Sequence, residues 1–352
     1  MAYLRSAEDI YDEQVLTITD VDTSKNSWIY NALMPDCMEK ANILMNLDET
    51  VKKVFASSAL VSGYSYYLEQ RCAEMGIYRK QATYAIIPIK VTGKSGSVFK
   101  KGSIVSTQNN RLYTTTEEIT LNENGEGTVT VIADESGAAY NVKAGEISYL
   151  PIKYSGIISI VNDSDYTDAY DEETDQELYD RYLAKVTNPS TGGNKYDYEN
   201  WALSVTGAGS ATCIPGAGNV KVIIANSNKR AADEELMQNV YDYIDSVRPL
   251  LAGTLTIATV KEISINVTGN VEIDTSVTLG DVQEAFKGLI ESYFDEKVYK
   301  SKKISIARIQ ALLIDIDGVT DCGGIKINGN ESNITLAVDE IAVLQDVKLG
   351  VI

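Results

Sequence analysis

Histidine is absent from this 352-residue chain, and its absence removes several kinds of active site at once. Hydrolases that rely on an imidazole base are excluded, and so is any metal site built on histidine nitrogen. The four cysteines are Cys37, Cys72, Cys213 and Cys322, with no C-x-x-C pair among them. We interpret them as buried thiols of a protein that folds in a reducing compartment.

Carboxylates are the other side chains that could do chemistry. Of the adjacent pairs Glu117-Glu118 and Glu234-Glu235, the first lies in a strand-like segment, where neighbouring side chains point to opposite faces and cannot share a site. Nine acids and no base lie from Asp163 to Asp180. The D-S-D-Y-T-D order there lacks the ligand at position five and the glycine at position six of an EF-hand loop. We predict solvated acids and no catalytic, metal or cofactor site, and leave open whether this acidic run binds a basic partner or an ion.

Two glycine-rich segments resemble nucleotide-binding motifs. The GKS sequence at 93–95 has Pro88 where a P-loop needs its first glycine, and it lies between two strands. The segment TGAGSATCIPGAGNV offers two possible registers of the G-x-G-x-x-G motif. The third glycine is replaced by Thr212 in the first register and by Lys221 in the second. We predict a hairpin turn at the first segment and, at the second, a loop that leads into the strand from Asn219.

Charge and hydropathy limit the partners and the compartment. The chain has 31 Lys and Arg against 50 Asp and Glu, a net charge of −19, which disfavours nucleic acid as a partner. The longest apolar runs are strand-sized, so we expect no membrane insertion. MAYLRSAEDIYDEQ has no apolar core of a secretory signal, and we expect synthesis in the cytoplasm.

The periodicity predicts an α+β multidomain fold with a helical arm at residues 1–80. Apolar residues recur there at steps of three and four, a second helix is expected from Ser58 to Glu74, and Gly76 marks a turn. This arm has too little sequence to bury its own apolar surface and needs something to pack on. We predict an assembly interface that consists of Trp28, Ile29, Leu33, Ile43, Leu44 and Leu47.

The rest of the chain changes period twice. Residues 81–160 alternate and are punctuated by turn sequences, which predicts an all-β, hairpin-rich module. An acidic junction with helices is expected at 161–204, and two α/β sandwich-like units at 205–260 and 261–352. Thr278 and Asp281 are spaced as a capping box at the start of a long helix.

Five stretches occur in the same order as in a known protein family. They are YLEQRCAEMGIYRKQATYA; GSVFKKGSIVST with RLYTTTEE; ADESGAAYNVKAGEISYL; EETDQELYDRYLAKVTNPSTGGNKYDYENWAL; and VRPLLAG. The fourth stretch includes Pro189. Together they resemble the baseplate J-like family, the wedge proteins in the baseplates of contractile phage tails and R-type bacteriocins. The resemblance covers roughly residues 60–330 and implies structural turns at Gly137, Asn141, Gly145, Gly192 and Gly193. Tyr170 stands where the family has glycine.

The resemblance implies an architectural role. In this family two copies join a smaller wedge subunit through N-terminal helices. Six wedges close a ring around the central hub and spike, next to the proteins that initiate the sheath, and the ring relays the trigger for sheath contraction. An alternative is a cell-surface or carbohydrate-binding module, suggested by the hairpins and 22 tyrosines. A histidine-free, carboxylate-based glycosidase is a third hypothesis. Charge reversal at Asp171, Glu172 and Glu173 is expected to change solubility or a partner contact more than the fold.

Overall fold

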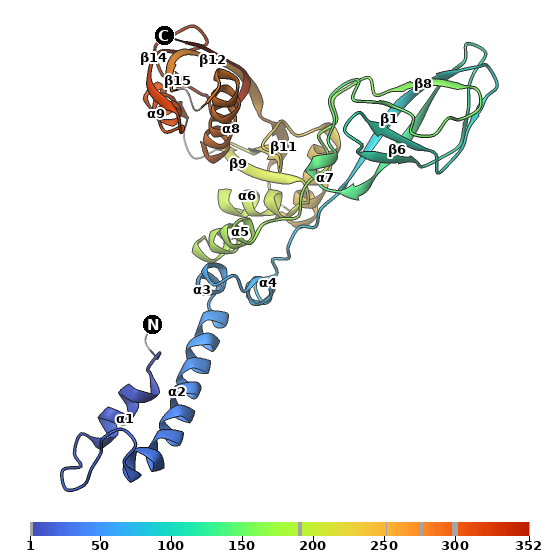
Figure 1. Cartoon of the computed structure of the whole chain (residues 1–352). Helices are drawn as coiled ribbons and strands as arrows, with labels where there is room; N and C mark the ends of the chain where they lie inside the picture. Colours follow the sequence, from blue (N-terminus) through green and yellow to red (C-terminus); the bar gives the residue numbers. More distant parts are fainter. Residues whose placement is uncertain (1–2, 189–191, 251, 275–276, 298–301, 352) are drawn as a thin grey trace. The chain divides into compact units, whose positions relative to one another are not determined.

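The computed structural model describes residues 3–188, 192–250, 252–274, 277–297 and 302–351. Pro189 of the fourth motif lies outside these described residues. The chain divides into two compact units, the first consisting of 1–80 with 173–187 and the second of 81–172 with 188–352. Figure 1 labels the elements of both.

The first unit is helical. Ser6 and Ser27 cap its first two helices through bonds from the backbone N–H groups of Asp9 and Tyr30. The single helix expected from Ser58 to Glu74 is wrong, because the chain turns at Gly63, which has a φ of 70° and separates two short helices. The helices are α1 (Ala7–Val15), α2 (Trp28–Val54), α3 (Ala56–Val61), α4 (Ser65–Ala73) and α5 (Asp175–Thr187).

Two small cores hold this unit together. Helices α1 and α2 bury Ile10, Tyr11, Met34 and Cys37 between them. Helices α3, α4 and α5 share the second core: Ala56, Ala59, Leu68, Cys72, Ile77 and Leu178. Leu178 comes from α5, so a segment far along the sequence completes a core that the first 80 residues begin.

The second unit starts with the β module, whose strands form a six-stranded sheet in the order β7-β3-β4-β6-β1-β8. Its edges approach one another, since the N–H of Ile147, at the start of β7, donates to the side chain of Asn162 (2.9 Å), the residue after β8. The result is a nearly closed barrel (Figure 1). Its core includes side chains of β1 and β6 together with Phe99 and Tyr113. The strands are β1 (Tyr84–Gly93), β2 (Val98–Phe99), β3 (Ile104–Thr107), β4 (Leu112–Thr115), β5 (Ile119–Thr120), β6 (Glu126–Ser136), β7 (Ile147–Tyr149) and β8 (Ile157–Val161), with a 3-10 turn η1 (Ala138–Tyr140).

An α/β unit follows, with α6 (Lys195–Ser204), β9 (Ala208–Gly216), β10 (Asn219–Asn226), α7 (Glu234–Val247) and β11 (Thr254–Thr259), and the sheet order β11-β10-β9. The glycine-rich loop expected before Asn219 is wrong, because those residues form the antiparallel strand β9. Gly209 permits this pairing, since a Cβ there would lie 2.4 Å from the carbonyl oxygen of Asn226. The ring of Tyr170 packs over Gly207, where an added Cβ would lie 2.8 Å from a ring carbon.

The C-terminal α/β unit packs two helices on the sheet β14-β12-β16. Its core includes Phe286, Ile290, Ile309 and Leu313, and the capping box of Thr278 and Asp281 is confirmed by reciprocal bonds. The elements are β12 (Lys261–Ile273), α8 (Leu279–Lys297), β13 (Lys303–Ile304), α9 (Ile306–Ile314), β14 (Val319–Ile327), β15 (Ile334–Thr335) and β16 (Glu340–Val351). The α+β multidomain fold class is thus confirmed. Within the described ranges, none of the helices has both the length and the apolar character to span a bilayer.

Candidate assembly surfaces and a charged junction

The long helix α2 has an inward face and an exposed surface. Leu33 and Leu44 pack against α1 together with Tyr30 and Ala41. Trp28, Ile43 and Leu47 instead face solvent, with exposed fractions of 81%, 59% and 42%. The six residues predicted as one assembly interface therefore divide, and only part of the set is available to a partner.

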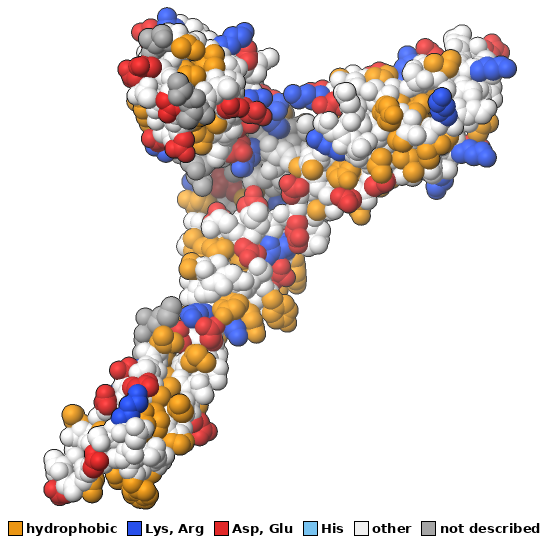
Figure 2. Space-filling view, in the orientation of Figure 1, with side chains coloured by type: hydrophobic (Ala, Val, Ile, Leu, Met, Phe, Trp, Pro, Cys, Tyr) orange, Lys and Arg blue, Asp and Glu red, His pale blue; other side chains and the backbone are white. Residues whose placement is uncertain are grey.

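Apolar side chains form a stripe along one flank of α2. Ile29, Ile43, Leu47 and Val54 are separated by 14, 4 and 7 residues, a heptad-like spacing that places them on one line. Ile29 is half-buried and the other three are exposed. Met38 and Met45 are also exposed but lie on the opposite flank of the helix. Figure 2 shows apolar side chains exposed along these helices. A stripe with this spacing is suited to a second helix packed alongside.

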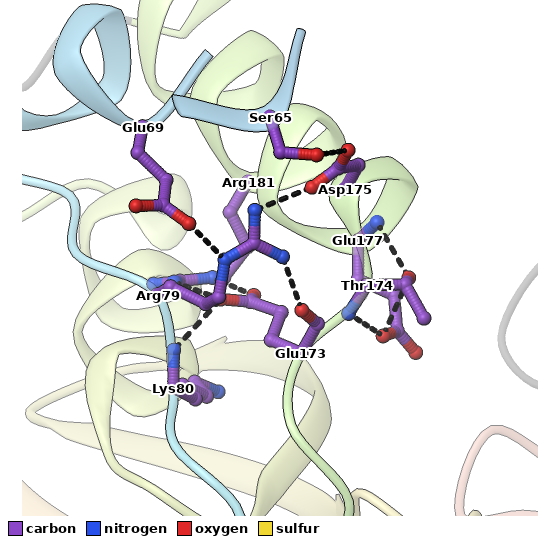
Figure 3. A network of polar contacts seen from close by, with 9 residues as sticks. All are labelled: Ser65, Glu69, Arg79, Lys80, Glu173, Thr174, Asp175, Glu177 and Arg181. Carbon is purple, nitrogen blue, oxygen red and sulfur yellow. Dashed lines mark hydrogen bonds and ion pairs between the residues drawn. The ribbon is translucent and has the colours of Figure 1, made fainter. Parts of the chain in front are cut away.

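A charged junction connects α4, the segment 78–80 that follows it and the start of α5 (Figure 3). The guanidinium group of Arg79 donates to the Glu69 carboxylate (2.6 Å), to the backbone carbonyl of Glu173 (2.5 Å) and to Asp175. Asp175 also accepts from the hydroxyl of Ser65, at the start of α4. Arg79 thus connects the middle of α4 to the start of α5.

Glu173 is the buried centre of this junction, with 8% of its surface exposed. Arg181 donates to both carboxylate oxygens, at 2.5 and 2.6 Å, and also to the carbonyl of Tyr78 at 2.7 Å. The backbone N–H of Lys80 donates to Glu173 as well (3.1 Å). A bidentate, buried pair of this kind is sensitive to loss of either partner.

The acidic run from Asp163 to Asp180 is largely committed to internal contacts. Besides Glu173 and Asp175, Asp165 accepts from the N–H of Ala144 and Asp171 from that of Ala138, both at 2.8 Å. Glu177 caps α5 through Thr174, and Asp180 accepts from Gln176. Among the described residues, no group of three or more acids or cysteines is arranged to hold a metal ion. These acids shape turns and helix starts.

All four cysteines are free and buried. Burial raises the pKa of the Cys72 and Cys213 thiols to about 11 and also raises the pKa of Cys37 and Cys322. A thiol with a raised pKa holds its proton at neutral pH and is a poor nucleophile. The structure therefore gives these cysteines a packing role.

The turn residues predicted from the sequence pattern and from the family resemblance are all in described segments. Five glycines have positive φ, between 69° and 124°: Gly76, Gly137, Gly145, Gly192 and Gly193. Asn141 has an extended backbone with φ of −66°. Its side-chain amide instead pairs with both backbone groups of Ala169, at 2.9 and 3.0 Å, which fastens the chain after β8 to the barrel.

Asp168 has an unfavourable electrostatic environment. Partial burial and the nearby carboxylates of Asp233 and Glu235 raise the pKa of Asp168 to about 6. Because the folded pKa lies above the ordinary value of 3.8, ionised Asp168 destabilises the fold above about pH 6, and this cost disappears as the pH falls toward 4. The side chain is more than a third exposed, so we discount the effect for solvent screening to about 1 kcal/mol.

We therefore expect Asp168→Asn to stabilise the protein by about 1 kcal/mol at pH 8 and to have little effect near pH 4. Calorimetry at both pH values measures the gain. Asp233 caps α7, and asparagine caps equally well, so Asp233→Asn removes the neighbouring charge alone. The gain from Asp168→Asn should shrink in that background, and an unchanged gain would show that Asp233 is not its cause.

Comparisons with known proteins account for most of the chain. Three family models match in order: the baseplate J-like protein barrel domain at residues 88–169, the baseplate J-like central domain at 190–259 and the baseplate J-like protein C-terminal domain at 264–350. Together they cover well over half of the sequence. The chain belongs to the baseplate J-like family.

Relatives of this baseplate J-like protein are similar over most of their length. The phage-like element PBSX protein XkdT of Bacillus subtilis is 29% identical over 340 residues, 94% of this chain and 93% of XkdT. Baseplate protein gp47 of Escherichia phage Mu is 27% identical over 275 residues, 72% of this chain and 74% of gp47. A chain of the anti-feeding prophage baseplate, solved by cryo-EM, aligns over 97% of this chain and 90% of its own length, with 10% identity and a TM-score of 0.40.

Sequence reasoning missed the part that Arg79 plays in the charged junction. Arg79 lies in an irregular segment, and its partners Glu69 and Asp175 are 10 and 96 residues away. No periodic pattern connects such positions. The one available signal was the concentration of acids before α5, which needed a cation from elsewhere in the fold.

Proposed function

We propose that this baseplate J-like protein is a structural wedge subunit of a contractile injection particle, either a phage tail or an R-type bacteriocin, without catalytic activity. Two copies join a smaller wedge subunit, and six wedges close a ring around the hub. Family membership and the relative from phage Mu named as a baseplate protein support this proposal. We further propose that the ring relays the trigger for sheath contraction, because its interfaces between subunits have two stable arrangements.

The exposed stripe on α2 is the observation that carries the assembly step. A helix that leaves Ile43, Leu47 and Val54 in water gains stability when a second helix covers them, by about 25 cal/mol for each Å² of apolar surface buried. We propose that the helices of the second copy and of the smaller subunit pack on this stripe. The α/β units then form the contacts between neighbouring wedges.

Ile43→Lys with Leu47→Lys tests this step, since it places two charges in the proposed helix interface. Co-expressed with the neighbouring baseplate genes, the variant should fail to form the hetero-oligomer, a loss of at least about tenfold that light scattering coupled to size exclusion measures. Met38→Lys with Met45→Lys, on the opposite flank, is the matched control and should assemble normally. Normal assembly of both variants, or equal failure of both, would count against the stripe.

A further inference from the structure

Charge is unevenly divided along the sequence. Residues 81–161 contain seven bases and seven acids, whereas residues 162–352 contain 16 bases and 31 acids, a net charge of −15. The β module is thus neutral within a strongly acidic chain. Two of its bases are engaged within the module, since Lys90 pairs with Glu126 and Arg111 donates to the carbonyl of Asn141.

Four exposed lysines gather in three turns at one end of the barrel, and we call this surface the lysine end: Lys94, Lys100, Lys101 and Lys153. The N–H of Lys94 bonds to the carbonyl of Gly156 (2.8 Å), and the rings of Phe99 and Tyr154 pack with centroids 5.1 Å apart. These contacts fix the three turns together. Figure 2 shows Lys and Arg side chains gathered at this end of the β module.

The lysines of the lysine end lack ion-pair partners among the described residues, although acidic side chains lie on nearby turns. None of its four lysines forms an ion pair with any residue of the described segments. Glu117, Glu118 and Glu123 lie on the turns after β4 and β5, and the lysines outnumber them. Exposed apolar side chains accompany the charges, with Val98 41%, Ile152 51% and Ile158 76% exposed. An apolar patch with charged groups around it matches the apolar core and polar rim of a protein interface.

Helix α7 offers the complementary surface. It contains no Lys or Arg, and its buried residues Leu236, Val240 and Ile244 leave the acidic side chains on the outside. Glu234, Glu235 and Asp242, which we call the acidic face of α7, form no ion pair within the described ranges. Asp245 is excluded because Arg248 pairs with it. Tyr243 and Val247 are 41% and 42% exposed beside these acids.

Other acidic surfaces fit less well. The acids of the run from 163 to 180 are mostly bound to backbone groups and arginines, as described above. Helix α1 also lacks bases, but Asp9 caps its N-terminus and Glu13 pairs with Arg5. Helix α8 has Lys287 among its acids, and its Asp295 pairs with Lys229. The acidic face of α7 remains as an exposed acidic surface with apolar neighbours.

We propose that the lysine end of the β module binds the acidic face of α7 on a second copy of this chain. This proposal rests on the proposed function in one respect, because it requires several copies of the chain in one assembly. Its unpaired charges are opposite in sign, and each surface has exposed apolar groups to bury beside them. Electrostatic complementarity of this kind selects the partner and sets the register between copies.

A charge-swap experiment on the full-length chain tests the contact. Lys100→Glu/Lys101→Glu/Lys153→Glu, and separately Glu235→Lys/Asp242→Lys, should each weaken self-association by about tenfold or more in sedimentation velocity at low salt. An equimolar mixture of the two variants should recover wild-type affinity, because each reversed surface then meets its complement. Lys221→Glu/Lys287→Glu/Lys348→Glu changes the charge equally outside the β module and is the control.

Several results would overturn the proposal. These are a wild-type chain that does not self-associate, a lysine-end variant that behaves like the control, or a mixture that fails to recover. Vesicles of anionic phosphatidylglycerol provide one more comparison. Vesicle binding that depends on the lysines, with self-association unchanged, would assign the surface to lipid. The variant Ile43→Lys with Leu47→Lys tests the wedge proposal independently. Failure of the charge swap can therefore be distinguished from failure of the wedge proposal.

Discussion

Glu173→Ala should open the junction between α4 and α5. The substitution leaves the guanidinium of Arg181, whose side chain is only 14% exposed, with the carbonyl of Tyr78 in place of a bidentate carboxylate. It also removes the acceptor for the N–H of Lys80. Removing one partner of a buried pair costs about 3–5 kcal/mol.

Hydrogen exchange measures this effect locally, which suits a chain built of two units. Amides of α4 and α5 should exchange at least about a hundredfold faster in the variant, since each 1.4 kcal/mol corresponds to tenfold. Asp180→Ala is the control, because Asp180 lies on the same helix, is exposed and, within the described segments, accepts only from Gln176. Wild-type protection of α4 and α5 in Glu173→Ala would refute a stabilising role for the pair.

This expectation corrects the interpretation of the acidic run. Charge reversal at Asp171, Glu172 and Glu173 was expected to spare the fold. The structure indicates the opposite for two of the three. Reversed Glu173 would place a cation against Arg181, and reversed Asp171 would lose the bond from the N–H of Ala138. The triple variant should therefore lose the cooperative melt.

Gly125→Ala is expected to disrupt the barrel. A Cβ at Gly125 would lie 2.1 Å from the carbonyl oxygen of Gly93, and the residue has a φ of 76°. The backbone itself must move, because Gly93 donates its N–H to the carbonyl of Gly125 at 2.8 Å. Strain and steric conflict together should cost about 3 kcal/mol or more.

Gly96→Ala separates the two causes. Gly96 has nearly the same φ, 73°, but a Cβ added there would meet nothing within 4 Å. We expect a cost of about 1 kcal/mol from the left-handed backbone alone. Amide exchange in β1 and β6 should rise strongly for Gly125→Ala and weakly for Gly96→Ala. Equal effects would mean that close approach at Gly93 contributes nothing.

The helices and strands could be predicted from the sequence where apolar residues recur at a regular spacing. The apolar steps of α2, the alternation of β1 and the capping box at Thr278 all depend on neighbours within a few residues. The break at Gly63 and the strand β9 were missed. Both depend on what the rest of the fold allows, namely a left-handed turn and the close backbone approach at Gly209.

The candidate surfaces were only partly accessible for a related reason. The sequence identifies apolar residues on α2 but does not divide those that α1 covers from those left exposed. Leu33 and Leu44 differ from Ile43 and Leu47 only in which flank of the helix they occupy. The pairing of Glu173 with Arg181 and Lys80 joins positions up to 93 residues apart, and sequence periodicity contains no information on such contacts.

The discontinuity of the first unit has a consequence for synthesis on the ribosome. Residues 1–80 emerge long before 173–187, and Leu178 is needed to complete the core of Leu68, Cys72 and Ile77. At about 5–20 residues per second, the nascent chain must wait roughly 5–20 s for α5. During that interval apolar side chains are uncovered while the whole barrel is translated. Slow translation through the barrel would prolong this exposure, so codon usage in that stretch is expected to affect the yield of soluble protein.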